Sequence, residues 1–573
     1  MNPLNFPVKH LFIYVLVLLT INLAVFLPSM RGDFLWDDKY FISENPNIQS
    51  PNFLKTFLVS PFGGFSGLDE NSAWMDRIMQ FYRPLTSLSY WVDFKVWGLN
   101  PAAFHLTNIL LHIANSVLLF FILLSLEISV APAFLSALLF SVFPLHFENV
   151  AWISGRTDLL SFLFAVLSVW FFIKFLDRRR GAYLGFSSLC FFLSLLSKEN
   201  AILLPVVYGL VFLRKGLSTK RAFLLILPYA GALAVWFVLR RIASGPGGLE
   251  YSGRTLSDFL AAFGFYTAKI VFPFRLSVTI NPVPVFKNIF YQIGGALLLA
   301  FFLVSLFQSV NKKTKGASAF LAFSSYPLFV LPSVVAIFFA STISLLAWRF
   351  LYLASAVFLA SLAVVLFKAL RPKAAPLFFL IPILLLFGSE IYPKNELYGK
   401  EEMVFWQSIK NIDREDVLAR SNIGIKGLSQ DEEKSLAILN RLLEDREQPL
   451  YPMLRVRIYE ELAAYYTGVK KFDRAEYYFN EIFKIQSSHS LVFYFNYAYF
   501  LALTGKAPEG EKIIKEILKL FPQNHFVLTR AAKFFLLIKD YAQAAEFYSK
   551  DYSLFRNKQS LVLLQEIESL LKK

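Results

Sequence analysis

The chain has 573 residues, of which 56% are hydrophobic, 63 are phenylalanine and only 17% are charged. A composition this apolar excludes an ordinary soluble enzyme and indicates a chain that is solvated partly by lipid. The formal net charge of +16 does not indicate a nucleic-acid partner, because the basic residues form short clusters between apolar runs, where membrane topology and lipid headgroups account for them.

Long apolar runs dominate the chain up to Ile391. A membrane-spanning helix needs about 20 apolar residues. The first run could be mistaken for a signal peptide, but it has no small-x-small cleavage site and only Lys9 as a basic flank, so we interpret it as a retained helix. Cys190, the single cysteine, lies inside such a run and excludes a disulfide framework or a CxxC site. The sequence predicts eleven spans, at 11–28, 105–126, 131–147, 159–176, 181–197, 200–213, 221–239, 288–310, 317–340, 348–369 and 375–392.

Basic clusters set the expected orientation, because cytoplasmic loops are enriched in Lys and Arg. With the N-terminus inside, every cluster lies in the cytoplasm, provided that the apolar stretch 256–274 does not cross. We therefore predict an interfacial or re-entrant helix there. The clusters are Arg178, Arg179 and Arg180; Arg214, Lys215, Lys220 and Arg221; Lys312, Lys313 and Lys315; and Arg371 and Lys373.

This orientation gathers several loops on the exocytoplasmic side. They are the long first loop 29–104, the loop 147–158, the turn 197–200, the loop 240–255 and the whole tail after 392. The sequence has no Asn-x-Ser/Thr sequon, which favours a bacterial cytoplasmic membrane over the endoplasmic reticulum for a chain with so much exocytoplasmic sequence.

The tail has the composition of a soluble protein and repeats itself every 34 to 35 residues from about 455. Small residues recur where paired helices cross and aromatic residues fill the space between pairs, as in a tetratricopeptide solenoid. We predict an all-α chain: a polytopic bundle at 1–392, a connecting segment with a partial repeat at 393–454, and a tetratricopeptide α-solenoid at 455–573. Such a tail typically binds a polypeptide and does no chemistry.

The first outer loop opens with adjacent carboxylates, Asp37 and Asp38, directly after Trp36. Two carboxylates beside a membrane span and an aromatic residue suit a general base with an orienting partner. The same pair is also common in solvated turns, so the motif alone does not decide. The loop later carries Arg83 in a Phe-Tyr-Arg-Pro-Leu motif.

The second outer segment, 143–158, concentrates His146, Glu148, Arg156 and Asp158. One histidine and no cysteine exclude a zinc site. A Mg²⁺ or Mn²⁺ site that uses Glu148 or Asp158 with phosphate oxygens is one hypothesis. Arg156 suits a phosphate clamp, because guanidinium makes planar bidentate hydrogen bonds; the alternative is an ion pair with Asp158.

Further charged residues sit near the outer ends of predicted helices. Lys198 and Glu199 either touch a ligand or cap a turn, and Arg349 and Tyr352 lie one helical turn apart, where snorkelling at the interface is the alternative. Arginines at the outer side suit an anionic lipid ligand. We interpret the polar residues of the second span as hydrogen-bonding partners between helices. The arginines are Arg240, Arg241 and Arg254, and the polar residues are His105, Asn108 and His112.

The order of these motifs resembles that of the transmembrane-and-tetratricopeptide-repeat O-mannosyltransferases, members of the GT-C glycosyltransferases. One departure stands out: where that family tends to have Ala-Glu-Arg, this chain has Ala347-Trp348-Arg349. The motifs are Phe34-x-Trp36-Asp37-Asp38, Asn45-Pro46, Tyr82-Arg83-Pro84-Leu85, Trp97-Gly98-Leu99-Asn100-Pro101, Phe104-His105-Leu106-x-Asn108, Leu111-His112, Pro144-x-His146-x-Glu148, Gly155-Arg156-x-Asp158 and Lys198-Glu199.

The resemblance implies transfer of a mannose-like hexose from a polyprenyl phosphate, on the outer side and with inversion, to an acceptor hydroxyl of a protein Ser or Thr. It implies Asp37 or Asp38 as the base, without separating them. Arg156, Arg241 or Arg349 would hold the leaving phosphate, with His146, Glu148, Asp158 and Tyr352 as further candidates, and Trp36, Arg83, Lys198 and Glu199 would position acceptor or loop.

Other functions remain compatible with the sequence. A related transferase could modify an envelope lipid or polysaccharide. The membrane body could instead anchor the tail as a non-catalytic scaffold, although an anchor has no use for so many charged residues near the bilayer. A transporter would show internal repeats in the membrane half, and none is clear.

Overall fold

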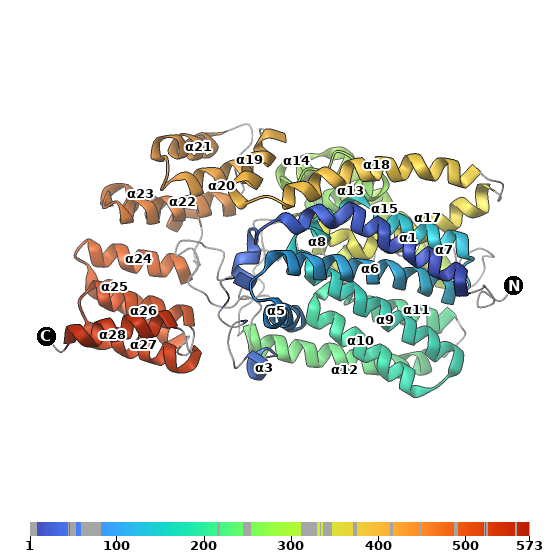
Figure 1. Cartoon of the computed structure of the whole chain (residues 1–573), viewed down its shortest axis with the longest axis horizontal. Helices are drawn as coiled ribbons and strands as arrows, with labels where there is room; N and C mark the ends of the chain where they lie inside the picture. Colours follow the sequence, from blue (N-terminus) through green and yellow to red (C-terminus); the bar gives the residue numbers. More distant parts are fainter. Residues whose placement is uncertain are drawn as a thin grey trace. The chain divides into compact units, whose positions relative to one another are not determined.

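The computed structural model describes part of the chain, and within it the only regular elements are helices (Figure 1). The all-α prediction is confirmed there. The predicted span 317–340 lies largely outside the described residues, and so do Lys215, Lys312, Lys313, Lys315, Arg371 and Lys373. The described residues are 8–43, 45, 48, 53–58, 82–214, 218–244, 254–310, 329–332, 334–335, 346–370, 375–412, 416–445, 450, 452–485, 491–520, 522, 525–555 and 558–571.

Packing divides the chain into two compact units. Unit 1 comprises Met1–Leu35, Arg83–Ser89 and Val96–Ser408, and unit 2 comprises Trp36–Tyr82, Tyr90–Lys95 and Ile409–Lys573. The sequence analysis placed the whole first loop with the membrane bundle. In the structure most of that loop belongs to the same unit as the tail.

Unit 1 is a bundle of apolar helices joined by short helical turns. Its elements are α1 (Val8–Phe26), η2 (Leu27–Arg31), α6 (Pro101–Ser125), α7 (Val130–Ser141), η4 (Pro144–His146), α8 (Phe147–Val150), η5 (Ile153–Gly155), α9 (Arg156–Arg178), α10 (Gly181–Ser197), η6 (Glu199–Ala201), α11 (Leu204–Arg214), α12 (Thr219–Ser244), α13 (Leu256–Val271), α14 (Pro282–Lys287), α15 (Ile289–Val310), η7 (Trp348–Leu351), α17 (Tyr352–Leu370) and α18 (Ala375–Tyr398). Two further helices, α5 (Pro84–Trp97) and α19 (Glu402–Ile412), contribute residues to both units.

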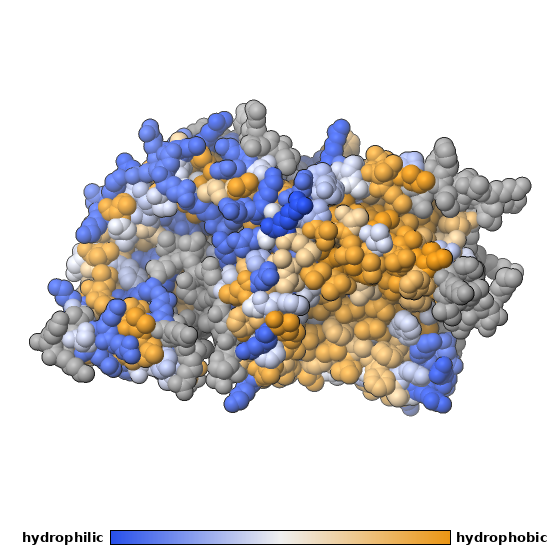
Figure 2. All heavy atoms as spheres, in the orientation of Figure 1, coloured by the Kyte–Doolittle hydropathy of each residue, from blue (hydrophilic) through white to orange (hydrophobic). Residues whose placement is uncertain are grey.

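Among the described residues, five helices are long and apolar enough to cross a membrane, and a bent pair, α7 with η4 and α8, would make a sixth. An integral multi-pass membrane protein is therefore confirmed, while the count of eleven spans stays a prediction. Figure 2 shows apolar side chains covering much of the surface of unit 1 and hydrophilic ones dominating over α19–α23. The predicted non-crossing stretch forms α13, which at 16 residues is shorter than a typical span.

Helix α6 organises the bundle, since it packs against α1, α7 and α9. It begins where Asn100 accepts a hydrogen bond from Ala102 N at 3.2 Å and Pro101 occupies the first turn, where its missing N–H costs nothing. Helices α9 and α10 form a hairpin, α10 packs on α12, and α17 on α7. Helices α13 and α15 approach so closely that a Cβ on Gly264 or Gly295 would clash with the facing backbone, as in other membrane helix pairs with small residues at the crossing.

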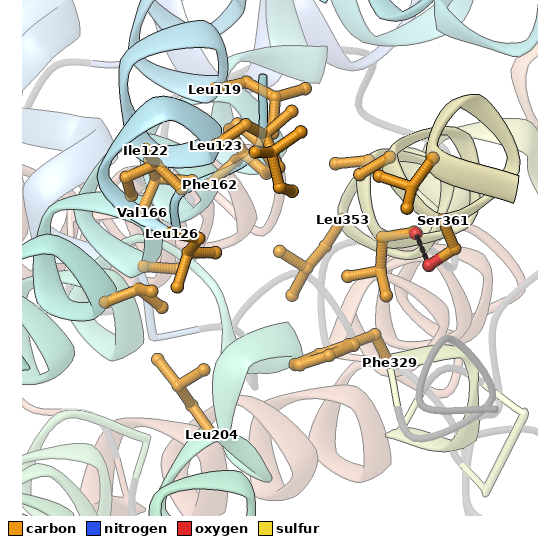
Figure 3. Close-up of a pocket in the computed structure, with 17 residues that line it drawn as sticks. Leu119, Ile122, Leu123, Leu126, Phe162, Val166, Leu204, Phe329, Leu353 and Ser361 are labelled. Atoms are coloured by element: carbon orange, nitrogen blue, oxygen red, sulfur yellow. Dashed lines mark hydrogen bonds between the residues drawn. The ribbon is translucent and has the colours of Figure 1, made fainter. Parts of the chain in front are cut away.

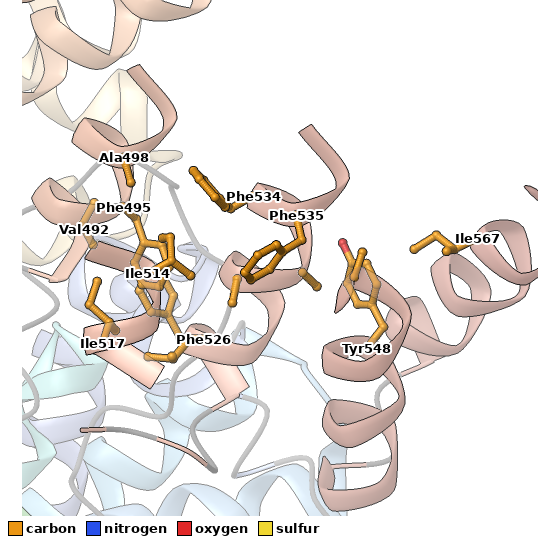
Figure 4. Close-up of a cluster of buried hydrophobic side chains, with 14 residues drawn as sticks. Val492, Phe495, Ala498, Ile514, Ile517, Phe526, Phe534, Phe535, Tyr548 and Ile567 are labelled. Carbon is orange, nitrogen blue, oxygen red and sulfur yellow. The ribbon is translucent and has the colours of Figure 1, made fainter. Parts of the chain in front are cut away.

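The tail part of unit 2 consists of helices that pair in chain order: α20 with α21, α22 with α23, α24 with α25, and α26 with α27, followed by α28. A buried apolar cluster joins α24 to α28 (Figure 4). The segment 393–454, predicted to hold a partial repeat, contains α20 and α21, which pack on each other. The tetratricopeptide assignment itself stays a prediction. The helices are α20 (Val417–Gly427), α21 (Glu432–Glu444), α22 (Pro452–Gly468), α23 (Phe472–Ile485), α24 (Leu491–Leu503), α25 (Ala507–Leu520), α26 (His525–Leu537), α27 (Tyr541–Phe555) and α28 (Lys558–Leu571).

Candidate active site

The segment 143–158, predicted as the second outer segment, is folded into unit 1. Every residue from 141 to 160 is buried. Gly155 explains part of this fold, because a Cβ there would lie 2.5 Å from the carbonyl oxygens of both Glu148 and Asn149. Only glycine lets η5 pack directly on the backbone of α8, and this contact fixes where the Glu148 side chain starts.

Glu148 and Arg349, which are 201 residues apart, form an ion pair. The second carboxylate oxygen of Glu148 accepts the Arg349 backbone N–H at 3.0 Å, and the Asn149 amide donates to Arg349 O at 3.1 Å. The guanidinium also lies 5.1 Å from the ring centres of Trp152 and Phe350. The side chain of Arg349 is still 16% exposed, against 5% for that of Glu148. The Arg349 guanidinium is therefore fixed in position by Glu148 but is still partly accessible to solvent.

This pair bears on the departure at Trp348. Trp348 is 1% exposed and donates its indole N–H to Ser277 O at 2.7 Å. The acidic residue that resembling proteins have at this position is thus replaced by a packing residue, while Glu148 supplies a carboxylate to Arg349. Arg349, the cationic residue of the signature, is retained, and the Glu148 carboxylate compensates its charge.

Buried polar side chains tie the start of α17 to α6 and η4. His112 Nε2 lies 3.1 Å from Ser141 O and must donate, since a carbonyl only accepts; Nδ1 therefore accepts from the Tyr352 hydroxyl at 2.6 Å. His146 has Nδ1 2.8 Å from Phe140 O and Nε2 2.8 Å from Ser355 Oγ. Both histidines are fully buried, and their hydrogen bonds position η7 and α17. The predicted role of His146 at a phosphate or metal site stays a hypothesis. The predicted role of His112 between helices is confirmed.

Asp158 is paired with Lys198. The Lys198 ammonium lies 2.7 Å from both carboxylate oxygens, and the Asn200 amide donates to one of them at 2.9 Å. Both charged side chains are almost fully buried, at 3% and 1% exposed. Burial lowers the pKa of Lys198 from 10.5 to about 8, even though the carboxylate of Asp158 acts in the opposite direction. The cationic partner of Asp158 is therefore Lys198, which lies in the turn between α10 and η6.

Arg156 is fully buried. Its guanidinium donates to Asn108 Oδ1 and to Phe104 O, each at 2.8 Å, and lies 3.4 Å from Ser89 Oγ. Asn108 in turn donates to the carbonyl oxygens of Trp152 and Ile153, as predicted for a residue that bonds between helices. These contacts assign Arg156 to the framework, and its predicted use as a phosphate clamp stays a hypothesis.

Arg83 and Glu199, two of the remaining charged candidates, form an ion pair. The Arg83 guanidinium lies 3.8 Å from the Glu199 carboxylate. Burial alone raises the pKa of Glu199, but Arg83, Arg240 and Lys198 outweigh it and lower that pKa. Arg240 is therefore the α12 arginine whose charge acts here, whereas Arg241 is exposed and stacks on Phe237 at 5.9 Å. The predicted role of Arg241 in holding the leaving phosphate stays a hypothesis.

The acidic pair of the first loop lies in unit 2 and opens a helical turn that continues as a π-helical turn, η3 (Lys39–Ser43). Asp38 is fully buried and Asp37 is partly exposed. Trp36, just before them, has φ of 53°, a left-handed conformation that costs a non-glycine residue free energy and is concentrated at functional sites. The signature residue Asn45 closes the segment, donating to Phe41 O at 3.1 Å.

An apolar cavity of about 550 Å³ lies within unit 1 (Figure 3). Helices α6, α9 and α17 supply most of its wall, with Leu204 and Phe329, and among the described lining residues Ser361 is the one polar residue. Leu353 in this wall follows Arg349 by about one helical turn. Phe162, also in the wall, packs edge-on against Tyr352 with ring centres 5.2 Å apart. Leu353 is the lining residue nearest in sequence to Arg349.

No group of three or more His, Cys, Asp or Glu side chains is arranged for a metal ion among the described residues. Glu148 and Asp158, the predicted Mg²⁺ or Mn²⁺ ligands, each hold a cationic side chain. A divalent cation at either carboxylate would have to displace that side chain, and the metal site stays a hypothesis.

Comparison with known proteins gives a consistent result for the membrane region. Residues 84–241 match the family described as dolichyl-phosphate-mannose-protein mannosyltransferase. The matched range contains the Asn108, Glu148, Arg156, Asp158 and Lys198 clusters, whereas Asp37, Asp38 and Arg349 lie outside it.

Named relatives point the same way. The chain is 33% identical over 165 residues to protein O-mannosyl-transferase TMTC1 of Mus musculus, which is 28% of this chain and 16% of that protein. It is 35% identical over 167 residues to TMTC4 of Homo sapiens (27% and 22%) and 32% identical over 193 residues to TMTC2 of Homo sapiens (33% and 22%). The aligned part is thus less than a quarter of the length of each of these proteins. The resemblance drawn from the motifs is confirmed for the membrane region.

Proposed function

We propose that this chain is a membrane glycosyltransferase that moves a mannose-like hexose from a polyprenyl-phosphate donor to a protein Ser or Thr hydroxyl, on the exocytoplasmic side and with inversion. Relatives that align with 27% to 33% of this chain are named protein O-mannosyl-transferases. Two features of unit 1 carry the proposal: the cation of Arg349 in η7, which is paired with Glu148, and an apolar cavity of about 550 Å³ whose wall includes Leu353 of α17.

A cation and an apolar cavity in the same unit suit an amphipathic lipid donor, which has an anionic phosphate and an apolar chain. A polyprenyl chain is wholly apolar, and small-ligand cavities of 300 to 1,000 Å³ bury such groups well. The phosphate needs a cation that stays in place when its sugar leaves. Guanidinium offers five N–H donors, and Arg349 is held by Glu148 and by two aromatic rings while part of it stays exposed.

The proposed reaction is a single displacement. The acceptor oxygen attacks the anomeric carbon as a carboxylate removes its proton, and the bond from that carbon to the phosphate oxygen breaks. The polyprenyl phosphate leaves as an anion, so cationic stabilisation replaces protonation. Partial exposure favours Asp37 as the base and complete burial favours Asp38 as its orienting partner. The tail would bind the acceptor polypeptide.

The direct test supplies purified full-length protein with polyprenyl-phosphate hexoses that differ in sugar, together with Ser/Thr-rich peptides and with envelope lipid and polysaccharide. Mass spectrometry then identifies the product. Transfer to peptide hydroxyls supports the proposal, transfer to lipid or polysaccharide replaces its acceptor, and no transfer from any donor contradicts it.

Filling the cavity should weaken binding of a long donor selectively. Ala360 lies in the cavity wall, so Ala360→Phe is expected to raise the KM for a long-chain polyprenyl donor about tenfold, or about 1.4 kcal/mol. A donor with a short prenyl chain should be affected by less than about twofold, because it does not reach the filled space. Val365→Phe is the matched control, since Val365 lies on the same helix, outside the cavity, and is 44% exposed. Equal effects on both donors would argue against lipid binding in this cavity.

Transfer is expected to fall as pH rises through about 8, where Lys198 loses its proton. The charged form holds Asp158, so deprotonation frees the α10–η6 turn from α9 and leaves a buried carboxylate without its cation. Lys198→Arg keeps a charge at all accessible pH values and should shift this alkaline limb upward, as measured by initial rates from pH 6 to 9.5. Lys471→Arg, in an exposed ion pair of the tail, serves as the control. An unchanged limb in Lys198→Arg would assign it to another group.

A further inference from the structure

The first loop packs on the tail. Tyr40, a partly buried residue of η3, lies against the apolar cluster that joins α24 to α28 (Figure 4). That cluster includes Phe495 of α24, Phe526 and Phe535 of α26, and Tyr548 of α27, all at most 1% exposed. More than 450 residues separate Tyr40 from these side chains in sequence. The contact therefore joins the loop to the tail within unit 2.

The acidic pair is directly attached to this contact. Asp37 and Asp38 precede Tyr40 in the same helical turn, and the residues after it, Phe41 and Ile42, are 4% and 0% exposed. Asn45 then fixes the far end of the turn: its amide donates to Phe41 O, and its Oδ1 accepts from Ile48 N at 3.4 Å. Because the contacts of Tyr40 and Asn45 both hold this turn, a displacement of the Tyr40 side chain would shift the neighbouring residues of the turn.

A second anchor holds the loop farther along. Phe53 stacks on Trp91 with ring centres 5.7 Å apart and planes 11° apart, and the Tyr82 hydroxyl donates to Leu58 O at 2.8 Å. Both contacts lie within unit 2: the first holds Phe53 to Trp91 of α5, and the second joins two parts of the loop. Neither contact involves the acidic pair. Before the pair, Phe34 packs edge-on against Phe104 with ring centres 5.4 Å apart, and Leu35 O accepts from the Trp152 indole N–H at 3.4 Å. After the pair, Tyr40 is the residue of η3 that packs on the tail cluster.

We propose that Tyr40 is a positioning residue through which the tail holds Asp37 and Asp38 in their reactive orientation. The tail then has two tasks, to bind an acceptor and to orient the base. The inference rests on the proposed function, because it assigns the acidic pair to the transfer reaction. Its physical reason is that a misplacement of about 1 Å at a reacting group can cost about 10²-fold in rate. A ring anchored in a close-packed cluster resists that displacement.

The test compares full-length wild type, Tyr40→Ala and Tyr40→Phe. Tyr40→Ala is expected to lower kcat about 10- to 100-fold with the donor KM within about twofold of wild type. Tyr40→Phe keeps the ring and should retain most of the activity. Backbone amides of residues 37–43 should exchange hydrogen faster in Tyr40→Ala, while those of α26 keep wild-type protection. Tyr541→Ala is the matched control, because Tyr541 packs on the same cluster from α27; it should leave exchange at 37–43 unchanged.

The two proposals fail in different ways. If wild type transfers no sugar, the proposed function is wrong, and the exchange measurement still decides whether Tyr40 orders the acidic turn. If wild type is active but Tyr40→Ala keeps both its kcat and the protection of residues 37–43, the positioning role is wrong. An equal loss of protection throughout α26 would also overturn it, by showing a general loss of packing.

Discussion

Asp37→Asn is expected to lower the rate of transfer about 10²- to 10⁴-fold, the range that general-base catalysis contributes. The amide is nearly isosteric with the carboxylate but cannot take a proton at neutral pH. Since Asp37 is partly exposed, the folded protein should keep its unfolding temperature. Donor binding should also persist, because the proposed phosphate contact is Arg349. Single-turnover rates and donor titrations on the same preparations separate these effects.

Two companion variants sharpen this result. Asp38→Asn alters a fully buried carboxyl, so it should lower both activity and unfolding temperature. Asp33→Asn is the matched control: Asp33 is an exposed acid shortly before the pair, and its carboxylate accepts the local Phe34 N–H at 2.7 Å. Full activity in Asp37→Asn with strong loss in Asp38→Asn would reverse the two roles, and full activity in both would refute the base assignment.

Glu148→Gln is expected to reduce transfer by at least about 10²-fold and to destabilise unit 1. Removing one partner of a buried ion pair costs about 3–5 kcal/mol, because the other charge stays buried without compensation. Here the lower end of that range applies, since the Arg349 side chain is 16% exposed and water can reach it. Thermal unfolding in detergent or nanodiscs, together with initial transfer rates, measures both consequences.

A double variant separates stability from chemistry. Glu148→Gln with Arg349→Met removes both charges and should regain much of the lost stability, because neither leaves an uncompensated partner. It should stay inactive, because the cation proposed to hold the leaving phosphate is gone. Glu390→Gln controls for loss of an ion pair elsewhere: Glu390 and Lys394 form an i,i+4 pair on α18, and such helix pairs contribute about 0.3–0.5 kcal/mol. Transfer activity in the double variant would exclude Arg349 from the reaction.

The buried polar groups of unit 1 form a supporting frame for this pair. His112, His146, Tyr352 and Ser355 fix the start of α17 to α6 and η4, and Gly155 lets η5 sit on the backbone of Glu148. These contacts fix the elements next to Glu148 and Arg349. In a low-dielectric interior such satisfied networks are rigid. That rigidity suits a site that must stabilise charge without rearranging.

Sequence alone determined the class of this protein. Apolar runs and their lengths predicted a multi-pass membrane chain, helical periodicity predicted an all-α fold, and the motif order predicted the resemblance to protein O-mannosyl-transferases. These are local or compositional signals, because the bilayer fixes helix length and the helix fixes side-chain period. Asn108 and His112 were also predictable, since polar residues in a span bond between helices.

Only the tertiary structure decided the partners. Arg156 and Asp158 are near neighbours in sequence, yet the guanidinium bonds to α6 and Asp158 to Lys198. Glu148 reaches Arg349 across 201 residues, and Tyr40 of the first loop packs on the tail. Charge pairing follows from which helix ends meet, and that depends on packing among helices whose apolar faces look alike in sequence. The sequence therefore determined what kind of protein this is, and folding decided which of its charges are framework and which remain open to a substrate.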